Sequence, residues 1–481
     1  MTTRLPIALG LFSMLVAAAA HSATPTTLYV SATAEPAGGN GSQGHPYRTI
    51  TSALDRARCI RYGCGPGAHG SVTPIVIRVL PGTYLVSWLP DRVAADPTLE
   101  RGPILMNVSG TTLAGSTVNA GDDGGFPSDL AVPGTETEIR PVDGEEPVTG
   151  NDQVRSLMLI HATHDAHGRA ERGDGTVVRG FLFDGRNDSE DQVDEAIAVR
   201  LVQGYAVTGN LFRTIGFIGV QAGPSIGAIT GNSAVDSGCL AVGVNGGSKS
   251  APQHTVVTNN SFMRNFCGGI IVLGDSVMLE GYDIGAQAGL FTLDALPNET
   301  LTSVATEIIG NRLSNNDVPG GDGFGVRIGI YSGSFGMNPA QTFTQMNVLM
   351  KSNEVRDNLV GIVVDSAFLS RDLVQTFSAR VNATFIDNDV CGNDDAPAIF
   401  DFVAGVGASD PTSVKYLQNS TYWLTYSGHD LDGFGYNNPA SDPYLLPAVT
   451  PLNNTLRVNG VSLHGTRSAT PRPCTDDNAR H

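Results

Sequence analysis

The chain has 481 residues, a formal net charge of −18, 58 glycines and an aromatic content of only 7%. A charge this negative repels nucleic acid and anionic membrane surfaces, so neither is expected as a partner. An acidic polysaccharide stays open as a partner, because divalent cations can bridge two like-charged molecules.

The first 23 residues have the pattern of a secretory signal peptide. Arg4 precedes an apolar run from Leu5 to Ala20, and small residues follow this run. No later run reaches the roughly 18 apolar residues that a membrane-spanning helix needs. We therefore expect residues 1–23 to be removed on export and the mature protein to be secreted or periplasmic, without insertion into a membrane.

The next segment is expected to open the fold and to cap it. Ile50, Leu54 and Ala57 lie on one face of an amphipathic run over residues 51–58, and Ile75 begins the first clear strand. The end of a stack of repeats must be covered against edge pairing. The run therefore predicts a short helix over the first coil. Further coils are expected at residues 104–113 and 177–183.

From Val207 to Val390 one short phrase recurs six times: an apolar residue, two more residues, an asparagine and, two places on, another apolar residue. The six asparagines are Asn210, Asn232, Asn260, Asn311, Asn353 and Asn388. Each copy is followed by a second apolar pair with one residue between its members. These pairs are Ile218/Val220, Leu240/Val242, Ile270/Val272, Phe324/Val326, Ile362/Val364 and the degenerate Ile399/Asp401.

A period-two apolar pair is half of a strand that faces a core. The repeats are too short for a crossover helix, so the chain is predicted to wind into coils stacked about 4.8 Å apart. Asparagine suits the corner because it tolerates the left-handed backbone region, and stacked amides can hydrogen-bond from coil to coil. The sequence therefore predicts an all-β, right-handed parallel β-helix. A β-sandwich is the alternative, but it does not explain asparagine at one recurring register.

This architecture predicts the division of the chain. Residues 24–410 are expected to form the β-helix with its N-terminal cap, and residues 411–481 a C-terminal extension packed on the last coils. Export permits disulfides. Cys239 and Cys267 precede equivalent strands on successive coils, so one coil step brings them within bonding distance. The remaining predicted pairs are Cys59 with Cys64, and Cys391 with Cys474.

The chain contains the phrase Tyr29-Val30-Ser31, the run from His45 to Ile50, the turn from Leu80 to Tyr84, and the Gly-Asn repeats. Together these features resemble the pectin-lyase-like superfamily of secreted parallel β-helix proteins. The resemblance covers roughly residues 28–405. That superfamily holds pectate and alginate lyases, chondroitinase B, galacturonases, epimerases, tailspikes and adhesins. The resemblance implies a groove along one stacked sheet and, for a lyase, an Arg or Lys base with calcium held by carboxylates.

Counting outward from the apolar pairs predicts which side chains line that groove. The row reads Arg200, Gln221, Gly243, Leu273, Arg327 and Asp365, with Asn245 and Asp275 one outward step further. Lyase chemistry needs a cation that neutralises the uronate carboxylate and a base near the carbon acid. We expect Arg327 to be the base or a carboxylate clamp and Arg200 to be a second clamp. Gln221, Asn245 and Asp275 are the expected substrate contacts.

Asp365 is expected either to bind calcium or to form an ion pair with Arg327. Asp191 and Asp194 belong to the densest carboxylate run, residues 188–195, which suits a calcium loop or an acidic solvated loop. A second cluster holds three histidines and is interpreted as a loop or, alternatively, as a metal site. Its members are His161, His164 and His167.

The leading functional hypothesis is a secreted polysaccharide lyase that acts on a uronate-containing glycan. The motifs of named families are missing, however: neither the Arg-x-Pro-x-x-Arg element of pectate lyases nor the Gly-His-Gly element of galacturonases occurs. Two alternatives therefore stay open. One is a non-catalytic glycan-binding or adhesive protein, and the other is an inverting hydrolase that uses two carboxylates such as Asp275 and Asp365.

Overall fold

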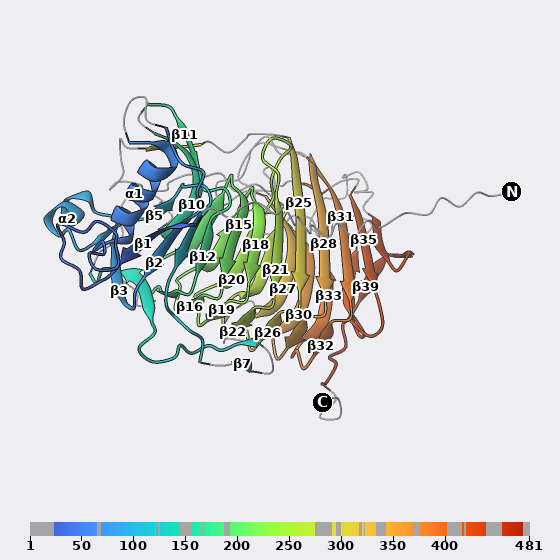
Figure 1. Cartoon of the computed structure of the whole chain (residues 1–481). Helices are drawn as coiled ribbons and strands as arrows, with labels where there is room; N and C mark the ends of the chain where they lie inside the picture. The colour runs from blue at the N-terminus through green and yellow to red at the C-terminus, as the bar shows by residue number, and fades with distance from the viewer. Residues whose placement is uncertain are drawn as a thin grey trace.

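The computed structural model describes residues 24–64, 69–120, 122–123, 126–144, 155–165, 167–186, 193–274, 291–294, 300–316, 320–321, 323–332, 343–368, 376–401, 416–417, 420–438 and 455–474. They form the predicted right-handed parallel β-helix, whose coils stack from an N-terminal cap to the C-terminal strands (Figure 1). The expected signal peptide, residues 1–23, lies outside the described residues. Within those residues, neither helix has the length and apolar character of a membrane span.

Three long sheets form the walls of the helix within the described residues. The 14-stranded sheet contains, in order, β1 (Thr26–Val30), β2 (Ile75–Val79), β6 (Thr111–Ala114), β12 (Val177–Arg179), β15 (Gln203–Thr208), β18 (Ile226–Thr230), β21 (His254–Thr258), β25 (Leu301–Ile309), β28 (Phe343–Lys351), β31 (Thr376–Ile386), β35 (Thr421–Tyr426), β37 (Thr455–Val458) and β38 (Val461–Leu463), with β34 (Tyr416–Leu417) paired to β31.

The other two sheets follow the same order along the stack. The 10-stranded sheet contains β4 (Glu100–Arg101), β3 (Gly82–Ser87), β9 (Thr137–Pro141), β13 (Leu182–Asp184), β16 (Leu211–Arg213), β19 (Ser233–Val235), β22 (Ser261–Met263), β26 (Arg312–Ser314), β29 (Glu354–Arg356) and β32 (Asp389–Cys391). The 13-stranded sheet contains β11 (Ala170–Arg172), β10 (Ser156–Asp165), β14 (Glu195–Arg200), β17 (Ile218–Ala222), β20 (Leu240–Asn245), β23 (Gly268–Leu273), β27 (Phe324–Ser332), β30 (Val360–Phe368), β33 (Ala396–Asp401), β36 (Gly435–Asn438) and β39 (Gly465–Arg467), with β5 (Ile104–Met106) and β24 (Phe291–Leu293) paired to β10. A short hairpin joins β7 (Asp122–Asp123) and β8 (Phe126–Pro127).

A regular coil passes from the 14-stranded to the 10-stranded and then to the 13-stranded sheet, as β15, β16 and β17 do. Inward residues of successive coils are register partners, so apolar side chains stack in columns inside the helix. One such column, fully buried, consists of Val220, Val242, Ile270, Val326 and Ile362. Each buried aliphatic side chain contributes about 1.5–3 kcal/mol of transfer free energy, so these columns hold the coils together.

The six repeat asparagines form the predicted column, at the corner between the 14-stranded and 10-stranded sheets. Each side-chain Nδ2 donates to the Oδ1 of the next asparagine over 2.8–3.1 Å. The backbone N–H of each rung donates to the same oxygen. The column ends at Asp430, whose Oδ1 accepts from the Asn388 N–H at 3.1 Å.

At this corner the left-handed backbone conformation belongs to the residue before each ladder asparagine. The prediction that the asparagine itself adopts this conformation is wrong. φ is +62° at Gly209, +55° at Asn259, +54° at Ser352 and +54° at Asp387. The ladder position therefore requires an amide that can donate and accept along the stack, while its predecessor carries the backbone turn.

A second asparagine ladder, which the sequence analysis missed, runs along the corner between the 10-stranded and 13-stranded sheets. Its Nδ2–Oδ1 distances are 2.9–3.1 Å. Its members are Asn265, Asn316, Asn358 and Asn393. Each follows an asparagine of the first ladder by the same interval in the sequence, and this regular spacing is the signal that could have revealed it.

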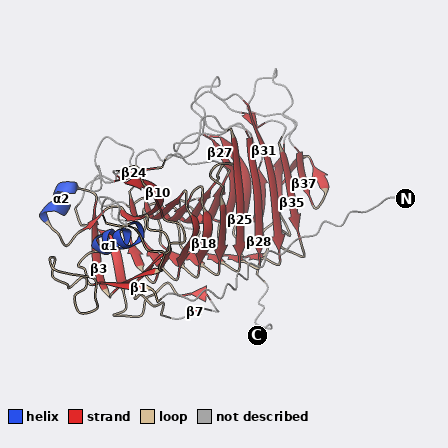
Figure 2. Ribbon diagram, turned by 45° about the horizontal axis from the view of Figure 1, so that its top comes forward, coloured by secondary structure: helices blue, strands red, loops and turns tan. Residues whose placement is uncertain are grey.

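The N-terminal cap is the predicted helix, α1 (Ile50–Tyr62), which lies at the end of the stack together with α2 (Pro90–Ala95) (Figure 2). Thr49 caps α1 by accepting from the Ser52 N–H. The buried carboxylate of Glu100 accepts from the backbone N–H groups of Ile50 at 2.5 Å and Thr51 at 2.9 Å. These bonds satisfy donors that a helix N-terminus leaves unpaired, so β4 holds α1 in place.

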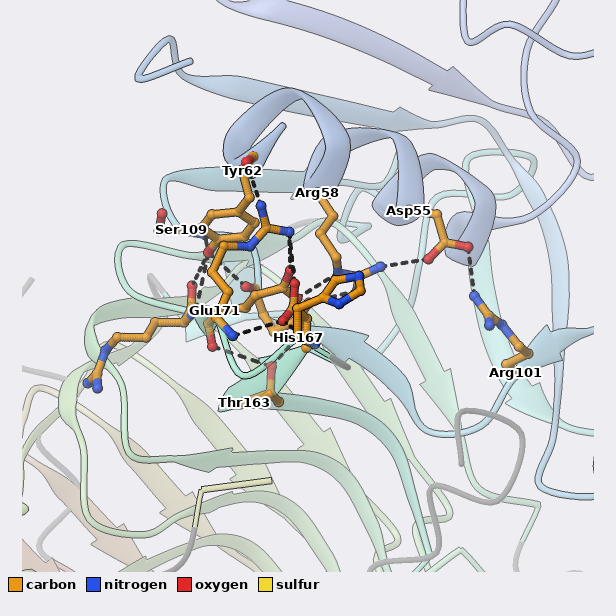
Figure 3. Close-up of polar contacts among 12 residues, drawn as sticks. Asp55, Arg58, Tyr62, Arg101, Ser109, Thr163, His167 and Glu171 are labelled. Carbon is orange, nitrogen blue, oxygen red and sulfur yellow. Dashed lines mark hydrogen bonds and ion pairs between the residues drawn. The ribbon is translucent and has the colours of Figure 1, made fainter. Parts of the chain in front are cut away.

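A polar network fixes the other end of α1 to β10 and β11 (Figure 3). Arg58 Nε lies 3.1 Å from Glu171 Oε2, an oxygen that also accepts from Asn107 Nδ2 at 3.0 Å. Asn107 Nδ2 donates in addition to Thr163 Oγ1 at 2.9 Å, and the Tyr62 hydroxyl donates to the Asn107 carbonyl at 3.0 Å. A buried carboxylate is stable when it is paired and hydrogen-bonded, so this network anchors the cap.

All three predicted disulfides are present, and they pair Cys59 with Cys64, Cys239 with Cys267, and Cys391 with Cys474. The middle bond joins neighbouring coils, with Cα atoms 4.3 Å apart. The last bond ties β32 to the C-terminal segment.

Parallel winding continues beyond residue 410, where the sequence analysis placed the end of the β-helix. β35 pairs in parallel with β31, and β36 pairs in parallel with β33. Only then do β38 and β39 turn back to pair antiparallel with β37 and β36. The segment after residue 410 therefore adds to the coils, and its antiparallel strands cover the last sheet edges.

Candidate functional site

The predicted groove residues lie on the outer face of the 13-stranded sheet, but in two columns rather than one row. One column consists of Gln221, Gly243, Ile271, Arg327 and Val363, which are successive register partners. The second column, two residues further along each strand, includes Asn245, Leu273, Gly329, Asp365 and Asp401. Val199 pairs with Ala222, which places Arg200 level with this second column.

Two features of these strands explain the difference from the predicted row. Ala241 and Val242 are consecutive, yet both belong to the core, so inside–outside alternation breaks between them. Ile218, Leu240 and Phe324, predicted to face inward, instead form a separate cluster with Ile271 outside the main core. The chosen apolar pairs also differ in register, because Val242 pairs with Ile270 and Val326 with Ile362. The pairs Ile270/Val272 and Ile362/Val364 therefore lie two residues further along their strands than Leu240/Val242 and Phe324/Val326, and this merged the two columns into one predicted row.

Arg200 does not stand open in the groove as a second clamp. Its side chain is 1% exposed. Its Nη1 donates to the carbonyls of Val199 at 2.9 Å and Gln221 at 2.7 Å, and its Nη2 lies 3.7 Å from Glu195 Oε1. Nη1 and Nη2 of the guanidinium therefore have partners within the protein, and the burial of this side chain does not favour the predicted role of a second clamp.

Gln221 and Asn245 lie near Arg200 on this face and are buried as well, which does not favour contact with a polymeric substrate at the surface. Two glycines make room for these side chains. A Cβ at Gly223 would lie 2.5 Å from Arg200 Cδ, and one at Gly243 would lie 2.2 Å from Gln221 Oε1. The third predicted substrate contact, Asp275, lies outside the described residues. The N-terminal half of this face is thus a packed polar layer.

The three clustered histidines do not converge on a metal. His161 is buried beside Arg200, and its Nδ1 hydrogen-bonds the Ala162 carbonyl. Burial lowers the pKa of His161 to about 4. His164 Nδ1 lies 2.6 Å from Asp294 Oδ1, whereas His167 is exposed. Among the described residues, no three His, Cys, Asp or Glu side chains are placed to hold a metal ion.

Of the two predicted calcium ligands in the acidic run, only Asp194 is among the described residues, and it has a protein partner. Asp194 Oδ2 accepts from the Arg155 N–H at 2.7 Å, and burial raises the pKa of Asp194. Asp191 lies outside the described residues, so calcium binding there stays a prediction.

Asp365 takes the second of its two predicted roles, because it pairs with Arg327. Arg327 Nη2 lies 2.5 Å and Nε 3.1 Å from Asp365 Oδ2, and the side chains are 17% and 11% exposed. The guanidinium also lies over the ring of Phe324, 5.8 Å from its centroid. A carboxylate partner favours the protonated guanidinium. This pairing suits the predicted role of a carboxylate clamp more than that of a base, and both roles stay predictions.

The next rung adds a carboxylate that the sequence analysis did not select. Asp401 is the register partner of Asp365, and its Oδ1 accepts from Asn437 Nδ2 at 3.3 Å. Register partners in a sheet lie about 4.8 Å apart. Asp401 was hidden in a degenerate apolar pair, although it follows an inward Phe400 just as Asp365 follows an inward Val364.

A cavity of about 230 Å³ lies where β14, β17 and β20 turn toward the 14-stranded sheet. None of the predicted site residues lines it. Its polar wall includes Arg172, whose Nε lies 2.7 Å from Asp174 Oδ2, and Asp294, which pairs with His164. The two charged residues of the described wall thus already have protein partners.

No protein-family model matches the chain, and no curated protein matches it in sequence. The solved structures that show similarity include the following two. The complex structure of XylC with xylose is 10% identical, with a TM-score of 0.31, over 83% of this chain and 75% of that chain. The DFA-IIIase from Arthrobacter chlorophenolicus A6 in complex with GF2 is 14% identical, with a TM-score of 0.38, over 90% of this chain and 99% of that chain. Similarities this low assign no activity.

Proposed function

We propose that the protein cleaves a polysaccharide lying across the outer face of the 13-stranded sheet, by hydrolysis between Asp365 and Asp401. The observation that supports this function is the pair of carboxylates on adjacent rungs, one held by Arg327 and the other by Asn437. Most glycoside hydrolases use two carboxyl groups that flank the scissile bond. The resemblance to secreted β-helix proteins that act on glycans points to the same substrate class.

The surroundings of the two carboxylates suit different roles. Asp365 faces a guanidinium, which suits a charged nucleophile, whereas Asp401 faces the neutral amide of Asn437, which suits a proton donor. Asp365 and Asp401 are one rung apart, and strands are spaced by about 4.8 Å. This spacing is nearer to the ~5–5.5 Å between the two carboxyl groups of retaining enzymes than to the larger carboxyl separation of inverting enzymes. We therefore propose retention of the anomeric configuration, in place of the inverting mechanism considered for Asp275 and Asp365.

β-Elimination on a uronate-containing glycan is the second candidate. The observation that favours it is Arg327, a partly exposed cation beside the carboxylate pair, which is placed to neutralise a substrate carboxylate if the bond to Asp365 opens. This role as a clamp keeps the positive charge of the side chain, unlike the role of a base.

The test is to incubate the mature protein with alginate, pectate, a glucuronan and neutral glycans, with and without calcium. Two products are followed together: new reducing ends, and the ultraviolet absorbance of unsaturated ends. Reducing ends without absorbance support hydrolysis, and both signals together support elimination instead. Binding without either product would overturn cleavage and leave a non-catalytic glycan-binding protein.

A further inference from the structure

A second surface of the molecule, on the outer face of the 14-stranded sheet, carries an exposed aromatic side chain among polar ones. The strands are β28, β31, β35 and β37, the last four parallel neighbours of this sheet (Figure 2). Trp423, on β35, is 46% exposed, although large aromatic side chains usually lie in a core. An exposed tryptophan on an ordered sheet is a common anchor for a binding partner.

Register places Trp423 within a row that runs from strand to strand along the helix axis. Asn347 pairs with Asn382, Asn382 with Trp423, and Trp423 with Arg457. Asn382 Nδ2 donates to Asn347 Oδ1 at 2.9 Å, so the two amides are held in fixed orientations. A row of two amides, an indole and a guanidinium offers hydrogen-bonding groups and a stacking face to one extended ligand.

The charge of this surface is opposite in sign to that of the chain as a whole. The four strands contain no Asp or Glu, although the whole chain has 47 acidic residues and a net charge of −18. They carry instead Lys351, Arg380 and Arg457, which are all exposed. Arg380 is two residues from Asn382 on β31, and is therefore a diagonal neighbour of Trp423. The surface is thus a cationic area on an acidic protein, and it is complementary to an anionic ligand.

We propose that this tryptophan platform (Asn347, Arg380, Asn382, Trp423 and Arg457) binds a uronate-containing polysaccharide without cleaving it. The indole provides a flat face for a sugar ring, the amides bind hydroxyl groups, and the two guanidinium groups bind carboxylates. The platform lies on a different sheet from Asp365 and Asp401. It goes beyond the proposed function, because a glycan can bind here whether or not those carboxylates cleave it.

Tryptophan fluorescence gives a direct test, because the chain has two tryptophans and the other, Trp88, is only 3% exposed. The mature protein is titrated with polygalacturonate, with alginate and with uncharged dextran. We expect a saturable change in emission with the two uronates and none with dextran. We also expect the apparent affinity to fall several-fold in high salt, because exposed charge pairs are screened.

Variants are compared by affinity electrophoresis in gels that contain polygalacturonate. We expect Trp423→Ala to weaken binding roughly tenfold or more, since central tryptophans often dominate an interface. Trp423→Phe is expected to retain part of the affinity, and Arg457→Gln to lose affinity several-fold. The matched control is Phe217→Ala, another exposed aromatic residue that lies outside the platform.

Unchanged affinity in both Trp423→Ala and Arg457→Gln would overturn the proposal. So would self-association that Trp423→Ala abolishes without any glycan binding, because the platform would then contact a second copy of the chain. Asp401→Asn separates the two proposals: it is expected to remove cleavage and to leave retention by the gel unchanged. Failure of cleavage therefore does not count against the platform, and failure of the platform does not count against cleavage.

Discussion

At the residue scale, His161 shows how the stack of coils sets the charge of a single side chain. The imidazole is buried on β10 beside Arg200, and the Nδ1 hydrogen bond to the Ala162 carbonyl leaves Nε2 without a partner among the described residues. Burial lowers its pKa from 6.5 to about 4, and the positive charges of Arg200 and Arg172 act in the same direction. The side chain is therefore neutral at neutral pH.

This pKa predicts how stability depends on pH. In the unfolded chain His161 takes up a proton near pH 6.5, whereas in the folded protein it does so only near pH 4. Above pH 6.5 the imidazole is neutral in both states and the protein has its full free energy of unfolding. As the pH falls toward 4, protonation of His161 in the unfolded chain lowers this free energy by up to about 3 kcal/mol. We expect His161→Gln to flatten the dependence of the unfolding free energy on pH between 6.5 and 4, as measured by urea denaturation.

The control for this measurement is His167→Gln, which replaces an exposed histidine instead of a buried one. An equal slope in His161→Gln and the parent would show that the imidazole does not titrate differently in the two states.

Single residues also show which parts of the site could be predicted. The disulfide between Cys239 and Cys267 followed from their positions on successive coils, and the pairing of Arg327 with Asp365 was one of two stated alternatives. Asp401 was missed because its strand departs from the apolar pattern. The burial of Arg200 could not be predicted, because it depends on Gly223 leaving space over the next coil.

At the scale of elements, the first asparagine ladder is the feature that fixes the coils in register. Each buried amide donates to one neighbour and accepts from another, so a rung is bonded on both sides. Asn260 Nδ2 donates to the Ile229 carbonyl at 3.0 Å and to Asn311 Oδ1 at 2.8 Å, and its Oδ1 accepts from Asn232 Nδ2 at 3.0 Å. Removing one amide leaves buried donors and acceptors unpaired on the adjacent coils.

We expect Asn260→Ala to reduce the free energy of unfolding by about 2–4 kcal/mol, because each orphaned buried group costs roughly 1–3 kcal/mol. Chemical denaturation followed by circular dichroism measures the change. Asn347→Ala is the matched control: this amide is on the exposed face, and its loss should cost less than about 1 kcal/mol. Equal losses in the two variants would contradict a stabilising role for the ladder.

The positions of the strands could be predicted better than which side of each strand points into the core. Recurring asparagines and apolar pairs mark the corners and the strands, and an amphipathic run marks α1. The assignment of faces fails at the bulge between Ala241 and Val242, where two successive residues point inward. No apolar pattern of period two reveals such a bulge, because the count stays regular on both of its sides.

At the scale of the whole molecule, the β-helix separates two surfaces on different sheets. The 13-stranded sheet carries the carboxylate pair, and the 14-stranded sheet carries the cationic tryptophan platform. α1 covers one end of the stack (Figure 2). At the other end, β38 pairs antiparallel with β37, and β39 pairs antiparallel with β36. Stacked coils make both surfaces long and straight, which suits a polymeric ligand more than a compact one.

The most direct measurement compares glycan cleavage by Asp365→Asn, Asp401→Asn and the parent protein on the glycan that gives the highest rate. We predict that each variant loses roughly 100-fold or more in kcat, the scale of a missing acid, base or nucleophile, while its circular dichroism spectrum and its Tm stay close to those of the parent. The control is Asp432→Asn, an exposed aspartate away from the carboxylate pair, which should keep the parent rate. Cleavage at the parent rate by either Asp365→Asn or Asp401→Asn would contradict the assignment of the active site to this face.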